Sequence, residues 1–97
     1  MPAYVIADVK VKDPELYKAY TALTPNAIAS AGGKFLVRGG ESTVMEGDWT
    51  PARVVVLQFE SASAAKAFYN SALYVEARAK RVGATEYFNM VVVEGIA

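Results

Sequence analysis

Apolar and polar residues follow two periodicities along the chain, and the switches between them predict alternating strands and helices. Stretches rich in β-branched and aromatic residues indicate four strands. We expect them at residues 3–11, 34–46, 53–59 and 86–94. Gly39 and Gly40 divide the second strand, so we expect a bulge at these glycines that bends it.

The first helix is expected between the first two strands. Asp13 is a good N-cap and Pro14 suits the first helical position, while the glycine pair at residues 32–33 marks the end. Apolar side chains recur between these points at helical spacing. Pro25 falls inside the pattern, so we expect a kink there, or a restart of the helix with Thr24 as a new cap.

A second helical region is expected between the third and fourth strands, and it is broken in two. Ser61 caps a short helix that ends near Asn70. Ser71 then caps a helix that continues through Val82 and stops at Gly83. The resulting order, β-α-β-β-α-β with a divided second helix, is the ferredoxin-like α+β arrangement, in which helices cover one face of an antiparallel sheet.

Both faces of this sheet are apolar in the sequence. The face expected beneath the helices carries Val5, Ala7, Val9, Val55, Leu57, Phe59, Phe88, Met90 and Val92. The opposite face carries Tyr4, Ile6, Val54, Val56, Tyr87, Val91 and Val93. Leaving these side chains in water would forgo on the order of 10 kcal/mol, at about 25 cal/mol per Å² of apolar area. We therefore expect a second copy of the chain to cover this face in a homodimer.

Length and charge narrow the classes of function. The chain has 97 residues, of which 54% are hydrophobic, so we expect a single domain over residues 1–97. Ten basic and ten acidic residues cancel, and no long apolar segment occurs, so we expect neither a nucleic-acid nor a membrane partner. The start of the chain does not resemble a secretory signal, which predicts a cytoplasmic protein.

Histidine and cysteine are both missing from the sequence. Their absence excludes serine triads, thiol chemistry and histidine-ligated metals. Carboxylates could still bind Mg²⁺, but no Asp/Glu group has a spacing typical of such ligands. We therefore expect no metal and no other cofactor.

Polar residues on the uncovered face form the candidate site. Asp8, Gln58 and Asn89 have the parity of that face in the first, third and fourth strands. Arg38 shares the parity of Leu36, which predicts the same side for it. An arginine in an apolar setting needs an anion, so Arg38 would pair with Asp8 internally or bind the carboxylate of a small ligand. Plain interface polarity is the remaining alternative.

Aromatic residues supply further candidates. Trp49 follows an acidic turn and could form a lid over a pocket, or simply cover the end of the sheet or pack on a partner. Tyr4, on the uncovered face, either contacts a ligand or fills the space between two sheets.

The broken helical region carries another possible set of ligand contacts, with Tyr69 and Asn70 at its centre. Tyr74, Arg78 and Arg81 share a helix face at spacings of four and three. These side chains could bind an anion. The alternative is that both arginines are solvated charges that the helix dipole favours.

Several motifs resemble a known family. The stretches "PAYVIADVKVKDPELYKAY", "GGKFLVRGGE", "VMEGDW", "RVVVLQF" and "FYNSALY" are similar to the family called domain of unknown function 1330, within the dimeric α/β-barrel superfamily. The resemblance covers nearly the whole chain. It implies a ferredoxin-like subunit whose sheet pairs face to face with that of a partner, but no established reaction.

Two functions of different classes are compatible with the sequence. In the first, the dimer is a cofactor-independent enzyme acting on a small aromatic or carboxylated molecule, with Asp8 as proton acceptor and Arg38 or Asn89 holding a developing oxyanion. In the second, it is a non-catalytic small-molecule-binding or protein-interaction module. The first requires a cavity of roughly 300 Å³ or more with convergent polar groups.

Overall fold

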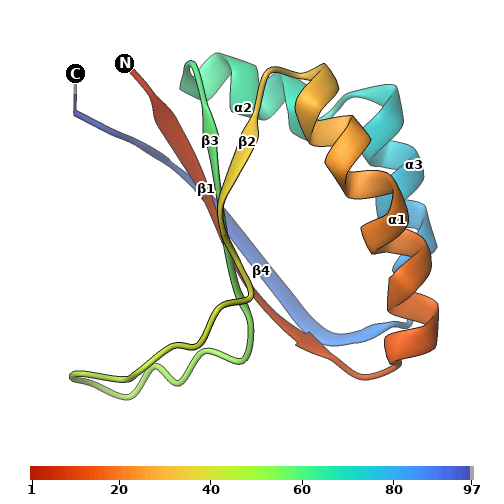
Figure 1. Ribbon diagram of the computed structural model, residues 1–97, viewed down its shortest axis with the longest axis vertical. Helices are drawn as coiled ribbons and strands as arrows, with labels where there is room; N and C mark the ends of the chain where they lie inside the picture. Colours follow the sequence, from red (N-terminus) through yellow and green to blue (C-terminus); the bar gives the residue numbers. More distant parts are fainter. Residues whose placement is uncertain (97) are drawn as a thin grey trace.

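Four strands and three helices make up the fold. The computed structural model describes residues 1–96, with the order β1 (Ala3–Val11), α1 (Pro14–Ser30), β2 (Lys34–Arg38), β3 (Val54–Phe59), α2 (Ala62–Tyr69), α3 (Ala72–Lys80) and β4 (Thr85–Glu94). The strands form one antiparallel sheet in the order β2-β3-β1-β4. All three helices lie on one side of it (Figure 1), as in the predicted ferredoxin-like α+β fold.

The three helices start at the caps that the sequence predicts. The side chains of Asp13, Ser61 and Ser71 accept hydrogen bonds from the backbone amides three residues onward, at 3.1, 3.0 and 3.3 Å. Each cap satisfies an amide that has no partner within its helix. These local contacts explain why the helix starts could be read from the sequence.

The expected restart of α1 at Thr24 is wrong, because the helix continues through Pro25 to Ser30. Proline lacks an amide hydrogen, so the carbonyl of Thr21 loses its usual donor four residues onward. The hydroxyl of Thr24 donates to that carbonyl at 3.3 Å. This substitute bond lets the helix pass the proline, and it also occupies the Thr24 hydroxyl hydrogen.

The core lies between the helices and one face of the sheet, with side chains of the predicted parity. Val5, Ala7, Val9, Leu57 and Phe59 are all buried there. Helices and sheet share an aromatic cluster, in which the ring centroid of Phe68 in α2 lies 5.0 Å from that of Phe59 in β3 and 4.3 Å from that of Tyr74 in α3. Burial of these rings fixes α2 and α3 against the sheet.

The bulge in β2 lies at Leu36 and not at the glycine pair. Phe35 is opposite Leu57, but Val37 is opposite Val56 and Arg38 is opposite Val55, so one residue of β2 is unpaired. Because side chains alternate between faces, one extra residue reverses the parity of everything after it. Arg38 therefore lies on the helix-covered face, and the prediction that placed it on the other face is wrong.

The expected second half of β2, residues 41–46, is also wrong, because these residues belong to a loop. Gly39 has φ of 72°, a conformation that favours glycine, and its amide donates to the carbonyl of Val54 at 2.8 Å as the last bond of the ladder. Strand β3 begins only at Val54, so residues 41–46 have no strand to pair with. Residues 40–50 are all exposed.

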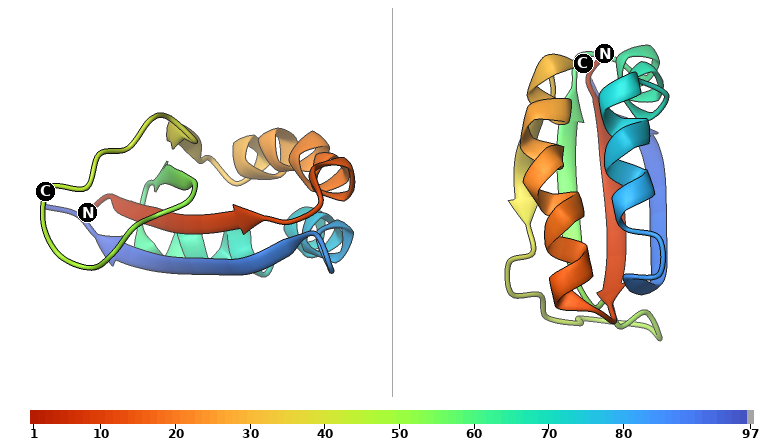
Figure 2. Two further views of the ribbon diagram at one scale, coloured as in Figure 1. Left: turned by 90° about the horizontal axis from the view of Figure 1, so that it is seen from below. Right: turned by 90° about the vertical axis from the view of Figure 1, so that its right-hand side faces the viewer.

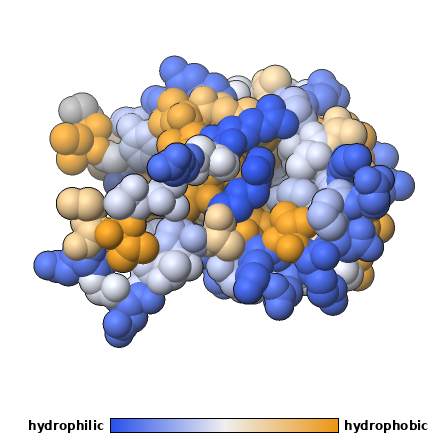
Figure 3. All heavy atoms as spheres, turned by 60° about the horizontal axis from the view of Figure 1, so that its bottom comes forward, coloured by the Kyte–Doolittle hydropathy of each residue, from blue (hydrophilic) through white to orange (hydrophobic). Residues whose placement is uncertain are grey.

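The sheet face that carries no helix is apolar and partly open. Val91 and Val93 are 55% and 46% exposed, and Ile6, Val54 and Val56 are half-buried. The loop of residues 39–53 and the two ends of the chain project on this side (Figures 1 and 2). Hydrophobic side chains lie on both projections in Figure 3. Within residues 1–96, no helix combines the length and apolar character that crossing a bilayer requires.

Candidate functional site

A small chamber lies between α1 and the sheet. Its volume is about 40 Å³, and most of its wall is apolar, formed by β-sheet residues such as Val55 and Leu57 and by Phe68 of α2. Helix α1 contributes Tyr17 and Tyr20. A cavity of this size has room for roughly three water molecules or one small polar group.

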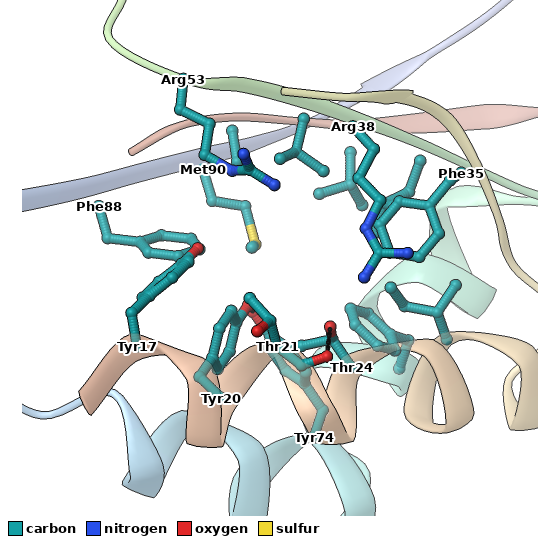
Figure 4. A pocket seen from close by; sticks show the side chains of 16 residues that line it. Tyr17, Tyr20, Thr21, Thr24, Phe35, Arg38, Arg53, Tyr74, Phe88 and Met90 are labelled. Atoms are coloured by element: carbon teal, nitrogen blue, oxygen red, sulfur yellow. Dashed lines mark hydrogen bonds between the residues drawn. The ribbon is translucent and has the colours of Figure 1, made fainter. Parts of the chain in front are cut away.

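Two arginines point into this chamber from the sheet. The side chains of Arg38 and Arg53 converge towards α1 (Figure 4). The guanidinium carbon of Arg38 lies 4.4 Å from the ring centroid of Phe35, a cation–π contact. The guanidinium of Arg53 packs against Gly39, where a side chain would force the guanidinium to move. The glycine that ends β2 thus also makes room for the second arginine.

Neither arginine has a carboxylate partner. The chamber is lined by no acidic residue, and the ion pairs found among residues 1–96 join Lys10 to Glu86 and Lys18 to Glu15. The Nε atom of Arg53 is buried without a hydrogen-bond acceptor. Arg53 is half-buried, whereas Arg38 is exposed. A partly buried guanidinium whose Nε lacks an acceptor is unfavourable, which makes the chamber a suitable environment for an anion.

A pair of tyrosine hydroxyls adds a hydrogen-bond donor to the chamber. The oxygens of Tyr20 and Tyr74 lie 2.6 Å apart, and both residues line the cavity. Burial raises the pKa of Tyr20, and the neighbouring Tyr74 raises it further. The Tyr20 hydroxyl is therefore protonated at neutral pH. Only one of the two hydrogens can lie between the oxygens, so the other is free to donate to a ligand.

Tyr17 is also protonated at the chamber wall. Burial raises the pKa of its hydroxyl, although the positive charges of Arg53 and Arg81 oppose that shift. The chamber thus combines two cations and neutral phenols within an apolar wall. This arrangement can bind an anion through charge and directed hydrogen bonds.

Asp8 lies on the opposite face of the sheet, so the predicted ion pair with Arg38 is wrong. Its carboxylate accepts hydrogen bonds from the indole Nε1 of Trp49 at 3.0 Å and from the amide of Ala52 at 2.9 Å. The Tyr87 hydroxyl is 3.5 Å from both carboxylate oxygens. Asp8 therefore anchors the loop of residues 39–53 to β1.

These bonds also determine the acidity of Asp8. Burial alone would raise the pKa of the carboxyl, but the hydrogen bonds from Trp49, from the backbone of Ala52 and Arg53, and from Tyr87 outweigh it and lower the pKa below its ordinary value. A carboxylate held in this way is a weak base. These contacts indicate that Asp8 has a structural role in the free subunit.

The other residues predicted for the uncovered face do lie there. Tyr4 is opposite Gln58, and Asp8 is opposite Asn89. Asn89 and Trp49 line a hollow of about 210 Å³ beside Asp8. Trp49 is 61% exposed, so it covers little of this hollow in the single subunit.

The residues predicted on the divided helix separate into two environments. Tyr69 and Asn70 line a second chamber of about 340 Å³ at the β4 edge, together with Arg81. Tyr74 is buried and lines the chamber under α1 instead. The guanidinium carbon of Arg78 lies 3.9 Å from the ring centroid of Tyr69 and lines neither chamber.

The sequence prediction missed Arg53 and Tyr20 as site residues. A usable signal was present for the first, because Arg53 has the parity of Val55 and Leu57, which were assigned to the helix-covered face. Tyr20 is one of the apolar residues at helical spacing in the first predicted helix, and that spacing indicates only a core position. Across residues 1–96, no three acidic side chains gather closely enough to hold a metal ion.

Solved structures with the same fold support the topology. A protein of unknown function from Rhodopseudomonas palustris is 20% identical, with a TM-score of 0.75, and the match covers 99% of this chain and 83% of that one. A dimeric ferredoxin-like protein of unknown function from Jannaschia sp. is 14% identical, with a TM-score of 0.72 over 98% and 100% of the two chains.

A third structure has a proposed activity. This candidate antibiotic biosynthesis monooxygenase from Nitrosomonas europaea is 15% identical, with a TM-score of 0.60 over 98% of this chain and 90% of that one. Identities this low concern the fold alone. Among curated proteins, none matches the chain significantly. The model of the family with the description domain of unknown function (DUF1330) matches residues 2–96, and the chain belongs to that family.

Proposed function

We propose that the protein binds a small organic carboxylate in the chamber between α1 and the sheet. The observation that carries this proposal is the convergence of Arg38 and Arg53 on a cavity without an acidic residue. Two guanidinium groups supply paired N–H donors that match the geometry of a carboxylate. The free hydrogen of the Tyr20–Tyr74 pair supplies a further donor.

The rest of the wall indicates the chemistry of the ligand's body. Apart from the arginines, the tyrosine hydroxyls and the threonines Thr21 and Thr24 of α1, the lining consists of aliphatic and aromatic side chains such as Phe35, Phe88 and Met90. These surfaces favour an apolar or aromatic group next to the carboxylate. The volume of about 40 Å³ suits the carboxylate itself, so the ligand's body extends beyond the chamber.

Catalysis is the second candidate function, although the chamber of about 40 Å³ is by itself well below the roughly 300 Å³ expected for the cavity of an enzyme. The arginines at the chamber would stabilise an oxyanion, for example an enolate formed from a bound acid or ketone. The fold similarity to a candidate monooxygenase supports this alternative. Asp8 is separated from the chamber by the sheet, so an enzyme using the chamber would need a base other than Asp8, such as the substrate itself.

The binding unit is proposed to be a homodimer. The open face presents half-exposed valines beside two projections of the chain (Figure 1), and a related fold from Jannaschia sp. is a dimer. A second copy that places its own open face on this one would bury the valines of both. Sedimentation equilibrium should then give twice the chain mass of 10.4 kDa.

Ligand binding is tested with benzoate, phenylacetate and the neutral analogue benzamide, by calorimetry and thermal shift. We expect a carboxylate to bind and benzamide to bind at least about tenfold more weakly, because each charged contact contributes about 1.5–3 kcal/mol. Arg53→Met should abolish most of the carboxylate's affinity. Arg78→Met is the matched control, since Arg78 lines neither chamber, and it should leave the affinity unchanged. Carboxylate binding that survives Arg53→Met and Arg38→Met would contradict the proposal.

A further inference from the structure

The chamber at the β4 edge has the same chemical character as the chamber under α1. It is lined by Phe68, Tyr69 and other apolar groups, with Lys66 and Arg81 as its cations and no acidic residue. The guanidinium carbon of Arg81 lies 3.8 Å from the ring centroid of Phe88. The Nε atoms of Arg53, Arg78 and Arg81 are all buried without an acceptor, but Arg81 lines this chamber and Arg78 lines neither chamber.

The two chambers share a wall. Val5, Phe68, Phe88 and Met90 line both of them. Val5 and Phe68 are fixed in the core at 2% and 1% exposure, whereas Phe88 and Met90 are only half-buried and belong to the edge strand β4. The Met90 side chain projects from the sheet into the chamber under α1 (Figure 4). An unbranched thioether adopts other rotamers at little cost, so Met90 is the part of the wall that yields most easily.

The position of Arg81 at the end of α3 explains why a cation is favourable there, but not why its guanidinium is stacked and partly buried. Arg81 is the C-cap of α3, where the helix dipole favours a cation. That interaction requires no cavity and is available to a fully solvated side chain. The stacked and partly buried guanidinium instead faces a chamber of about 340 Å³ with a second cation, Lys66, on its wall.

We infer that the two chambers form one elongated site for a dicarboxylate with an apolar middle. One carboxylate binds Arg38 and Arg53, the apolar part passes Met90, and the second carboxylate binds Arg81 and Lys66. This inference rests on the proposed function, because the first carboxylate occupies the site proposed there. It adds the class of the ligand: an acid with a negative charge at both ends.

The inference is tested by calorimetry with linear dicarboxylates from succinate to sebacate, each compared with the monocarboxylate of the same chain length. We expect one chain length to bind at least about tenfold more tightly than its monocarboxylate, an advantage of about 1.4 kcal/mol. Arg81→Met should remove that advantage and leave the affinity for monocarboxylates unchanged. Arg53→Met should weaken the binding of both, and Arg78→Met should weaken neither.

Three further controls keep the test decisive. Thermal melts show which variants are folded. If Arg81→Met unfolds, Arg81→Lys, which keeps the charge, is measured in its place. Arg81→Lys should retain part of the affinity advantage of the dicarboxylate over its monocarboxylate. Met90→Ile puts a stiffer, branched side chain in the shared wall and should weaken the binding of the dicarboxylate more than that of its monocarboxylate. Monocarboxylate binding that depends on Arg53, without any advantage for a dicarboxylate, would overturn the inference and leave the proposed function standing. No binding of either class would overturn both.

Discussion

The two faces of the sheet differ in whether the chain supplies hydrogen-bond partners for the charged side chains on them. Asp8 pairs with Val54 in the ladder between β1 and β3, and Arg53 directly precedes Val54 in the sequence. The side chains of Asp8 and Arg53 nevertheless lie on different faces of the sheet. On the open face, the Asp8 carboxylate accepts hydrogen bonds from Trp49 and Ala52. On the covered face, the Nε of Arg53 has no acceptor within residues 1–96.

This difference separates a structural charge from a binding charge. A carboxylate whose donors all come from its own chain is satisfied as soon as the chain folds, and it gains nothing from a ligand. A guanidinium that the fold leaves unpaired reduces the stability of the free protein and gains that energy back when an anion binds. The two groups should therefore respond to removal with changes of opposite sign.

The largest effect is expected from a charge on the open face, which tests what covers it. Val56 is half-buried at the centre of the sheet, between Ile6 and Val37. Val56→Asp would bury an isolated carboxylate in the proposed dimer interface, at a cost of several kcal/mol. Sedimentation equilibrium should show loss of the dimer, or thermal melts should show unfolding. Val75→Asp, on the exposed side of α3, is the control and should keep the dimer. A dimeric, stable Val56→Asp protein would refute the interface.

The next largest effect, on the free energy of unfolding, is expected from replacing the Asp8 carboxylate that anchors the loop to β1. Asp8→Asn keeps the shape but replaces the ionised acceptor with an amide that faces the donors of Trp49 and Ala52. The free energy of unfolding should fall by about 2 kcal/mol at pH 7, as measured with urea. Asp48→Asn, in the exposed part of the same loop, should change it by less than about 0.5 kcal/mol.

The pH dependence of that loss follows from the lowered pKa of Asp8. The unfolded chain binds this proton near the ordinary pKa of 3.8, whereas the folded protein binds it only at lower pH. The stabilisation is therefore complete above 3.8 and is lost as the pH falls through the folded value. The difference between the wild type and Asp8→Asn should shrink in acid. A difference that grows in acid would show that Asp8 is not held as an anion.

A smaller effect of opposite sign is expected on the covered face. Arg53→Met removes a guanidinium whose buried Nε has no acceptor and leaves an apolar side chain against the same wall, so the free energy of unfolding of the ligand-free protein should rise by about 0.5–1 kcal/mol. Arg78→Met should not raise it: the Nε of Arg78 also lacks an acceptor, but its Nη2 donates to the carbonyl of Tyr69 at 3.1 Å and its guanidinium stacks on the Tyr69 ring, and both contacts would be lost. If Arg53→Met lowers stability by as much as Asp8→Asn does, the two faces do not differ as argued.

Much of the fold could be predicted because its determinants are local. The caps at Asp13, Ser61 and Ser71 act over three residues. Alternation along β1, β3 and β4 assigned side chains to the correct faces, because β1 pairs with both neighbours without interruption from Ala3 to Asp8. A pattern of period two is reliable wherever the ladder is regular.

The site could not be predicted in the same way. The bulge at Leu36 has no glycine to mark it, and it arises only from how β2 pairs with β3, so Arg38 was assigned to the wrong face. The partners of Asp8 and Tyr20 are Trp49 and Tyr74, which lie 41 and 54 residues away. Contacts of that range depend on the assembled fold, and no local pattern in the sequence contains them.

The smallest effect is expected from the other half of the anchor. Trp49→Phe keeps an aromatic ring on the loop but removes the indole N–H that donates to Asp8 at 3.0 Å. Trp49 is 61% exposed, so water can replace part of this bond, and the loss of stability should be about 0.5–1 kcal/mol. Urea unfolding followed by far-UV circular dichroism measures it, since the variant has lost the single tryptophan.

A double-mutant cycle shows whether that loss belongs to the contact with Asp8. In the Asp8→Asn background the indole no longer has an ionised acceptor, so Trp49→Phe should cost close to nothing there. Equal costs in both backgrounds would mean that Trp49 stabilises the loop by packing alone. The carboxylate would then be held by the Ala52 amide and Tyr87, and the open face would have a weaker internal anchor than its geometry implies.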